Sequence, residues 1–170
     1  MSPRSRSAQL VGLLAWLLAT FAAAAVGAVA AVDAASFYAQ LSKPAWAPPA
    51  GVFGPVWSVL YALMAVAAWL VWRPVSSTAG STARSRAVAL GLFGMQLAAN
   101  ALWSWLFFAW HRGALAAVEV LVLLALIVAT FVAFWRISRP AALLLVPYLV
   151  WVSYASVLTW AVLRSNPGLL

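Results

Sequence analysis

The chain has 170 residues, of which 67% are hydrophobic and 7% are charged, and its formal net charge is +8. Because so few charged side chains cannot cover the surface of a water-soluble globule, the composition predicts a membrane protein. With no cysteine, one histidine and two acidic residues, the chain excludes disulfides and thiolate metal sites, and it has too few ligands or catalytic groups for a metal centre or a hydrolase.

Charged breaks divide the chain into five apolar segments, each close to the roughly 20 residues that a membrane-spanning helix needs. Their predicted limits are 9–32, 53–72, 87–110, 114–135 and 141–163. The expected fold is therefore all-α, a single integral membrane domain over 1–170 built as a five-helix bundle. Glu119 is the only charged residue within these segments, and we expect its side chain to snorkel to the interface or to pair with Arg112.

The first segment also allows a second interpretation. Arg4 and Arg6 precede the apolar run, and Ala28-Val29-Ala30 fits the small-residue cleavage site of a signal peptide. The apolar run is longer than the roughly 7 to 15 residues of a signal peptide, which favours a retained helix.

Basic residues are shared unevenly between the two sides of the predicted bundle. Seven of the ten fall on one side, Arg4, Arg6, Arg73, Arg84, Arg86, Arg136 and Arg139, and three on the other, Lys43, Arg112 and Arg164. The positive-inside rule then predicts a cytoplasmic N-terminus. Dispersed arginines form no continuous basic face, so we expect membrane lipid and not nucleic acid as the partner of this charge.

The connection after the first segment is rich in proline. Pro44, Pro48 and Pro49 fix the backbone on either side of Trp46 and disfavour helix in the residues before them. Such a stiff loop holds Trp46 either as a lid over the end of the bundle or, with Tyr38, as an anchor at headgroup depth, which is the commoner use of interfacial rings.

Helical spacing places several aromatic and polar residues on shared faces. These sets are Trp57, Tyr61, Met64 and Ala68; Gln96, Asn100 and Ser104, continued by His111; and Trp151, Ala155 and Thr159, with Tyr154 beside them. In hydrocarbon the polar members of these sets are expected to face other helices. There they either form interhelical hydrogen bonds or serve as polar groups of a ligand cavity. We favour the hydrogen-bonding role for Gln96 and weigh the two roles equally for Asn100.

Small residues recur on the first and third segments, at Ala23, Gly27 and Ala31, at Ala87 and Gly91, and at Gly94 and Ala98. Such positions either seat one helix against another or form a dimer face.

Four ordered motifs resemble a known family: FYAQLSKPAWAPP, VFGPVWSVLYALM, NALWSWLFF and PYLVWVSYASVLTW. They are similar to those of the TspO/MBR family, the tryptophan-rich sensory proteins and translocator proteins, over nearly the whole chain after the first segment. The resemblance implies a pocket that opens toward the loop between the first two helices, and often a homodimer. It also implies binding of porphyrins such as protoporphyrin IX and, in some members, haem, sterols or benzodiazepine-type ligands, with no cofactor required.

The resemblance also implies the ligand-binding residues. Trp46 is the expected lid, Trp57 and Asn100 line the pocket, and Trp151 and Ala155 form its far wall; Tyr38, Tyr61 and Trp103 complete the candidate set. A porphyrin is expected to stack on Trp57 and Trp151, with its carboxylates near Lys43 or Arg112. Two departures are Phe37, where many members have tryptophan, and Trp160, where the animal cholesterol motif has tyrosine, so sterol binding through that motif is not expected.

A receptor or sensor that regulates tetrapyrrole or stress responses is the favoured function. A porphyrin transporter and a light- and oxygen-driven porphyrin degradation that uses Trp57 and Trp151 are the alternatives; otherwise no catalytic residue is expected. The expected location is a bacterial cell membrane, and the resemblance also allows an outer membrane.

Overall fold

The computed structural model describes residues 5–73 and 83–170, and over these ranges the chain is helical, without a strand. Five helical stretches are long and apolar enough to cross a membrane, at 6–30, 50–72, 83–109, 113–135 and 139–165. The predicted all-α membrane bundle of five spans is therefore confirmed. Its elements are α1 (Arg6–Ala30), α2 (Ala34–Gln40), η1 (Ala50–Val52), α3 (Phe53–Trp72), α4 (Ala83–Ser104), η2 (Trp105–Ala109), α5 (Gly113–Trp135), α6 (Arg139–Leu143) and α7 (Val146–Ser165).

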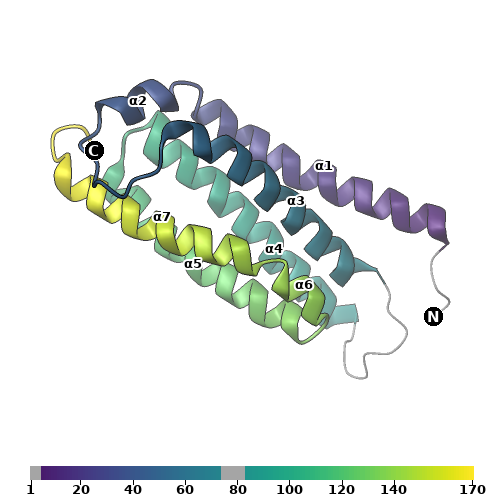
Figure 1. Ribbon diagram of the computed structural model, residues 1–170. Coiled ribbons are helices and arrows are strands. Elements are labelled where there is room, and N and C mark those ends of the chain that lie inside the picture. Colours follow the sequence, from purple (N-terminus) through teal and green to yellow (C-terminus); the bar gives the residue numbers. More distant parts are fainter. Residues whose placement is uncertain (1–4, 74–82) are drawn as a thin grey trace.

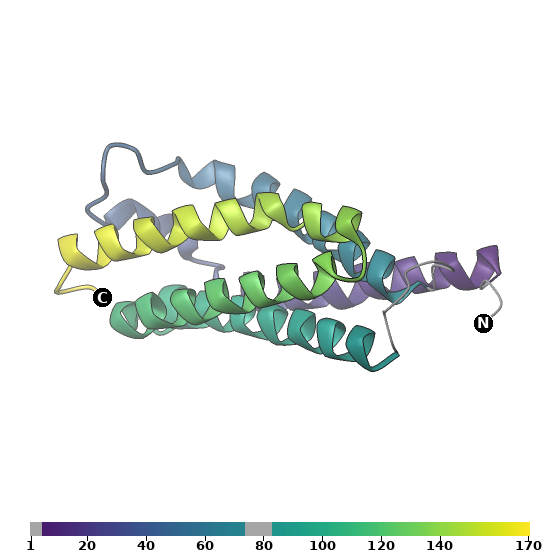
Figure 2. The same ribbon diagram turned by 90° about the horizontal axis from the view of Figure 1, so that it is seen from below.

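The long helices run side by side along one axis (Figure 1). α4 packs against α5, α1 against α3 and α4, and α7 against α5. Short α2 and the loop that follows it lie at one end of the bundle, the end at which the chain also terminates, and the view from below in Figure 2 keeps the same elongated arrangement. The connection that carries Trp46, expected as either a lid or an interfacial anchor, is thus at a bundle end.

The fifth span is broken, whereas the sequence predicted one continuous helix from residue 141. α6 ends at Leu143 and α7 begins at Val146, with Pro147 in its first turn. Proline has no backbone N–H and its ring clashes with the carbonyl four residues earlier, so in the interior of a helix it causes a kink or a break. The break before Pro147 is the consequence.

The third span ends in a π-helical turn, η2. The Trp110 N–H donates to the Trp105 carbonyl at 2.9 Å, and His111 follows outside the helix with φ of 50°. The expectation that His111 continues the stripe of Gln96 and Asn100 is therefore wrong. A π-turn inserts an extra residue, which moves every later side chain off the earlier face.

The core consists of two hydrophobic clusters. The loop-side cluster contains Tyr38, Leu41, Leu106, Phe107, Ala116, Leu158 and Val162. The main cluster fills the rest of the bundle; its largest fully buried side chains include Met64, Phe93, Leu123, Phe134 and Tyr148. The ring of Trp16 on α1 meets Phe93 edge-on at 5.8 Å, so the first segment packs as part of the bundle.

The described basic residues separate between the two ends as predicted; Arg4 lies outside the described ranges. Arg6 begins α1 and Arg73 follows α3, where its carbonyl accepts a hydrogen bond from Arg86 Nη1 at 3.3 Å. Lys43 and Arg112 lie in the connections at the other end. The end away from α2 is thus the predicted cytoplasmic end.

Candidate ligand-binding site

The proline-rich loop is fastened to the C-terminal end of α7. Asn166 accepts from Ser42 N at 2.8 Å and donates to Ser42 O at 2.9 Å and to Val162 O at 2.7 Å. Lys43 Nζ donates to the carbonyls of Tyr38, at 2.5 Å, and Leu41, at 2.8 Å. Because its ammonium group donates to two loop carbonyls, Lys43 stabilises the loop.

Tyr38 and Trp46 hold the loop on the bundle. The Tyr38 hydroxyl donates to Pro48 O at 3.0 Å, and its buried ring packs edge-on against Phe53 at 5.5 Å. Burial, with a contribution from Tyr154, raises the pKa of Tyr38 above its ordinary value. Trp46 is 48% exposed, and its carbonyl accepts from the Tyr154 hydroxyl at 3.0 Å.

Five aromatic rings contact one another in series beneath this loop. Trp46 lies 5.6 Å from Tyr154, Tyr154 lies 5.8 Å from Trp151, and Trp151 lies 5.9 Å from Phe53, which contacts Tyr38. The series joins the loop to the start of α3 and the middle of α7. The structure thus brings together Tyr38, Trp46 and Trp151 from the candidate set.

A buried hydrogen-bond network, the polar triad, lies about one turn deeper. The Tyr61 hydroxyl donates to Asn100 Oδ1 at 2.5 Å, and Asn100 Nδ2 donates to the Tyr148 hydroxyl at 3.2 Å. The Trp57 ring covers both tyrosines, at 5.5 Å from Tyr61 and 6.1 Å from Tyr148. Three further candidates, Trp57, Tyr61 and Asn100, therefore meet across α3, α4 and α7.

Tyr148 and Phe53 join the site without having been singled out from the sequence. Tyr148 lies three residues before Trp151 and seven before Ala155, a spacing that puts it on the same helical face and was available as a signal. Phe53 precedes Trp57 by four residues in the same way. Ala155, the remaining wall candidate, is half-buried one turn beyond Trp151.

Trp103 connects the two clusters, because its partly buried ring packs against both. It stacks on Phe107 with ring centroids 5.1 Å apart and planes at 10°. Its Nε1 is buried and has no hydrogen-bond partner.

Glu119 departs from both expectations for it. Its side chain is 8% exposed, and its Oε2 is buried without a hydrogen-bond partner. It does not snorkel, and over the described ranges no ion pair joins it to Arg112, which is exposed. The reason is its position on α5, where its neighbours Ala116, Val120 and Leu123 are all buried.

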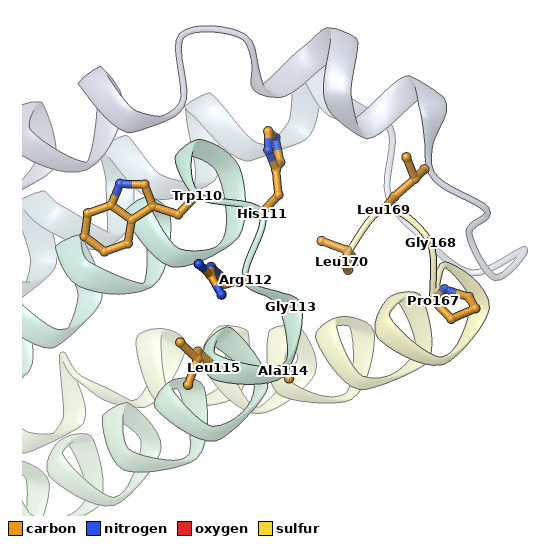
Figure 3. A pocket seen from close by; sticks show the side chains of 10 residues that line it. All are labelled: Trp110, His111, Arg112, Gly113, Ala114, Leu115, Pro167, Gly168, Leu169 and Leu170. Carbon is orange, nitrogen blue, oxygen red and sulfur yellow. The ribbon is translucent and has the colours of Figure 1, made fainter.

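A cavity of about 480 Å³ lies elsewhere at this end of the molecule, between the α4–α5 turn and the C-terminal residues (Figure 3). The Arg112 side chain lies between Trp110 and Leu115, whereas His111 points away from them, its ring 4.2 Å from that of Phe37. None of the eight candidate ligand-binding residues lines this cavity, whereas Arg112, one of the two cations expected near a ligand carboxylate, does. The candidate residues instead contact one another through the aromatic series and the polar triad.

Comparisons with known proteins agree with the four motifs. The model of the TspO/MBR family matches residues 13–164. The chain is 39% identical to the translocator protein of Homo sapiens over 132 residues, 78% of this chain and 76% of that one. It is 40% identical to the tryptophan-rich protein TspO of Chlorobaculum tepidum over 133 residues, 77% and 80% of the two chains.

A third relative covers more of the chain. The tryptophan-rich sensory protein of Cereibacter sphaeroides is 37% identical over 153 residues, 90% of each chain. These matches, together with five spans, support a multi-pass integral membrane protein of a bacterial cell.

Proposed function

This chain is a member of the TspO/MBR family, and from that premise we propose that it is a membrane receptor or sensor that binds porphyrins, with protoporphyrin IX or haem as ligand, inside the helical bundle. The observation that carries the proposal is the aromatic series from Trp46 to Tyr38 above the polar triad. Apolar walls of rings with a few convergent polar groups are typical of small-molecule sites.

The chemistry of these residues suits a flat, apolar ligand. Trp57 and Trp151 lie on α3 and α7, about one turn apart in depth, and each offers an indole face on which a porphyrin can stack. The polar triad beneath them supplies hydroxyl and amide groups that orient the plate. At the loop end, Arg112 is exposed and over the described ranges its side chain makes no ion pair, so it is the cation we expect to meet a propionate.

Entry of the ligand requires the loop to lift. The loop is held to the bundle by the Tyr38–Pro48, Tyr154–Trp46 and Asn166–Ser42 hydrogen bonds. We propose that occupancy of the site shifts the loop between a closed and a raised position, which would pass the presence of porphyrin to a partner. The favoured location is the cell membrane.

A homodimer is the expected assembly, and α4 offers a face for it. Gly91 and Gly94 are exposed, and a side chain built at either would meet nothing within 4 Å. Gly27 on α1 differs, because a Cβ there would lie 3.2 Å from Ser104 Oγ, so this glycine seats α1 against α4. Since the chain has no cysteine, a single Gly91→Cys variant can be cross-linked in membranes to test the α4 face.

Titration of the detergent-purified protein with protoporphyrin IX in the dark tests the proposed function. We expect saturable binding that weakens about five- to tenfold in Trp57→Phe and Trp151→Phe, because stacking area is lost. Trp160→Phe is the matched control, since Trp160 is 57% exposed and far from the series along α7. Binding that rises linearly and ignores all three substitutions would refute the site. A loss of porphyrin absorbance under light that requires Trp57 and Trp151 would favour degradation over sensing.

A further inference from the structure

The level at which the loop-side cluster meets the main cluster, here called the seam, carries two buried polar atoms that the polar triad does not use. Trp103 packs against both clusters. Glu119 lies on α5 between Ala116, a member of the loop-side cluster, and Leu123, a member of the main cluster. Both residues therefore belong to the seam.

The two atoms are complementary and neither is satisfied. Trp103 Nε1 is a hydrogen-bond donor, Glu119 Oε2 is an acceptor when the carboxyl is ionised, and each is buried without a partner. A buried polar group without a partner destabilises a protein, and more so in a bundle surrounded by hydrocarbon. Such a pair in a native core points to a group that occupies the space between them.

Helix geometry brings the two side chains toward one depth. The Arg112 N–H donates to Leu106 O at 2.8 Å, which ties the start of α5 to the end of the third span. Glu119 lies seven residues after Arg112, a rise of about 10 Å along α5. Trp103 lies three residues before Leu106, a rise of about 4.5 Å along the third span. Side chains lean toward the N-terminus of their own helix. Since α4 and α5 are antiparallel, the Trp103 indole leans inward and the Glu119 carboxyl leans outward, so both lean toward a common depth in the bundle.

The packing of the helices supports the same location. Tyr148 belongs to the polar triad beneath Trp57. It lies on α7, which packs against α5, the helix of Glu119. Glu119 is thus on a helix that borders the proposed porphyrin site, although it belongs to neither the aromatic series nor the triad.

We infer that Trp103 Nε1 and Glu119 Oε2 bind a carboxylic acid or hydroxyl group carried by an otherwise apolar ligand. One such group satisfies both residues, because its oxygen accepts from the indole N–H while its O–H donates to the carboxylate. The inference rests on the proposed function and deepens it: one of the two propionic acid groups of protoporphyrin IX is held here as the protonated acid. Two ionised carboxylates cannot share a buried site, so a single proton is shared between Glu119 and the ligand.

The test compares protoporphyrin IX with its dimethyl ester, which keeps the ring and lacks the O–H donor. Both are titrated against the full-length protein in detergent, and the ratio of their dissociation constants is the readout, since partitioning into micelles cancels when variants are compared. We expect the ratio to favour the diacid by about tenfold more in the wild type than in Glu119→Leu or Trp103→Phe. Gln96→Leu is the matched control, because it also removes a fully buried polar group with an unpartnered oxygen, in this case from beside Met64.

Each outcome is decisive. Saturable binding with the same ratio in the wild type, Glu119→Leu and Trp103→Phe would overturn the inference and leave the porphyrin site intact. A ratio that falls equally in Gln96→Leu would also overturn it, because the effect would then be general to buried polar groups. No saturable binding of either compound to the wild type would overturn the proposed function and the inference together. Trp103→Phe keeps the stacked ring, so it decides the question even if Glu119→Leu does not fold.

Discussion

Replacing Asn100 by alanine removes the only side chain shared by two buried tyrosine hydroxyls of the polar triad. The amide accepts from Tyr61 at 2.5 Å and donates to Tyr148 at 3.2 Å. Interhelical hydrogen bonds in membrane proteins contribute about 0.6 kcal/mol on average and up to about 1.7 kcal/mol each. Because both hydroxyls stay buried and unpartnered in the variant, we expect the upper half of the range for two bonds, a loss of about 2 to 3 kcal/mol in the free energy of unfolding.

The assay is reversible unfolding in mixed micelles, with Tyr61→Phe and the double variant measured in parallel. Tyr61→Phe removes one bond and leaves one amide oxygen unpartnered, so we expect a loss of about 1 kcal/mol. The double variant should lose less than the sum of the two single variants, because the Tyr61–Asn100 bond is counted in both. Additive losses, or an Asn100→Ala cost within about 0.5 kcal/mol of zero, would refute the view that these side chains form one network.

Three further predictions concern the loop and the α1 interface. Asn166→Ala removes the two hydrogen bonds that join Ser42 of the loop to the end of α7, and the bond from Asn166 to Val162 O that orients the amide. Proteolysis within residues 41–52 should therefore accelerate severalfold, while Asn166→Asp, which keeps an acceptor for Ser42 N, should show an intermediate rate. Burial raises the folded-state pKa of Tyr38 above its ordinary value of 10.0, so the stability that the neutral phenol contributes is present below pH 10.0 and is lost as pH rises through the folded pKa. The melting temperature should therefore fall less steeply between pH 8 and 11 in Tyr38→Phe than in the wild type. An equal slope in the two proteins would contradict this. Gly12→Ala should destabilise the protein by about 1 to 3 kcal/mol, because a methyl group there overlaps the Trp72 ring. Gly51→Ala is the control and should not destabilise the protein, since a methyl group there meets open space. Equal melting temperatures for the two variants would contradict the packing of α1 on α3.

Much of this protein follows from the sequence without reference to tertiary contacts. Composition alone selects the membrane as solvent, and the lengths between charged breaks yield the five spans, because a helix that crosses the hydrocarbon needs about 20 predominantly apolar residues. Helical periodicity also places Trp57 and Tyr61 on one face, and their rings do lie 5.5 Å apart. Such features depend on one helix at a time.

Other features depend on how helices meet, and these only the tertiary structure decided. Tyr148 enters the polar triad because α7 packs at a depth and rotation that bring its hydroxyl within 3.2 Å of Asn100 Nδ2. Glu119 is buried, and not paired with Arg112, because its face of α5 packs into the core. Lys43 turns inward because the loop folds back on Tyr38.

The physical reason is the range of the interactions involved. The hydropathy of a span depends only on its own residues, and the backbone of a helix forms its hydrogen bonds within the span. A single window of the sequence therefore predicts where a span lies. A side-chain hydrogen bond between helices requires a particular depth and rotation of both partners. In this chain the π-turn before His111 also changes the face of the side chains after it, in a way that a period of 3.6 residues does not predict.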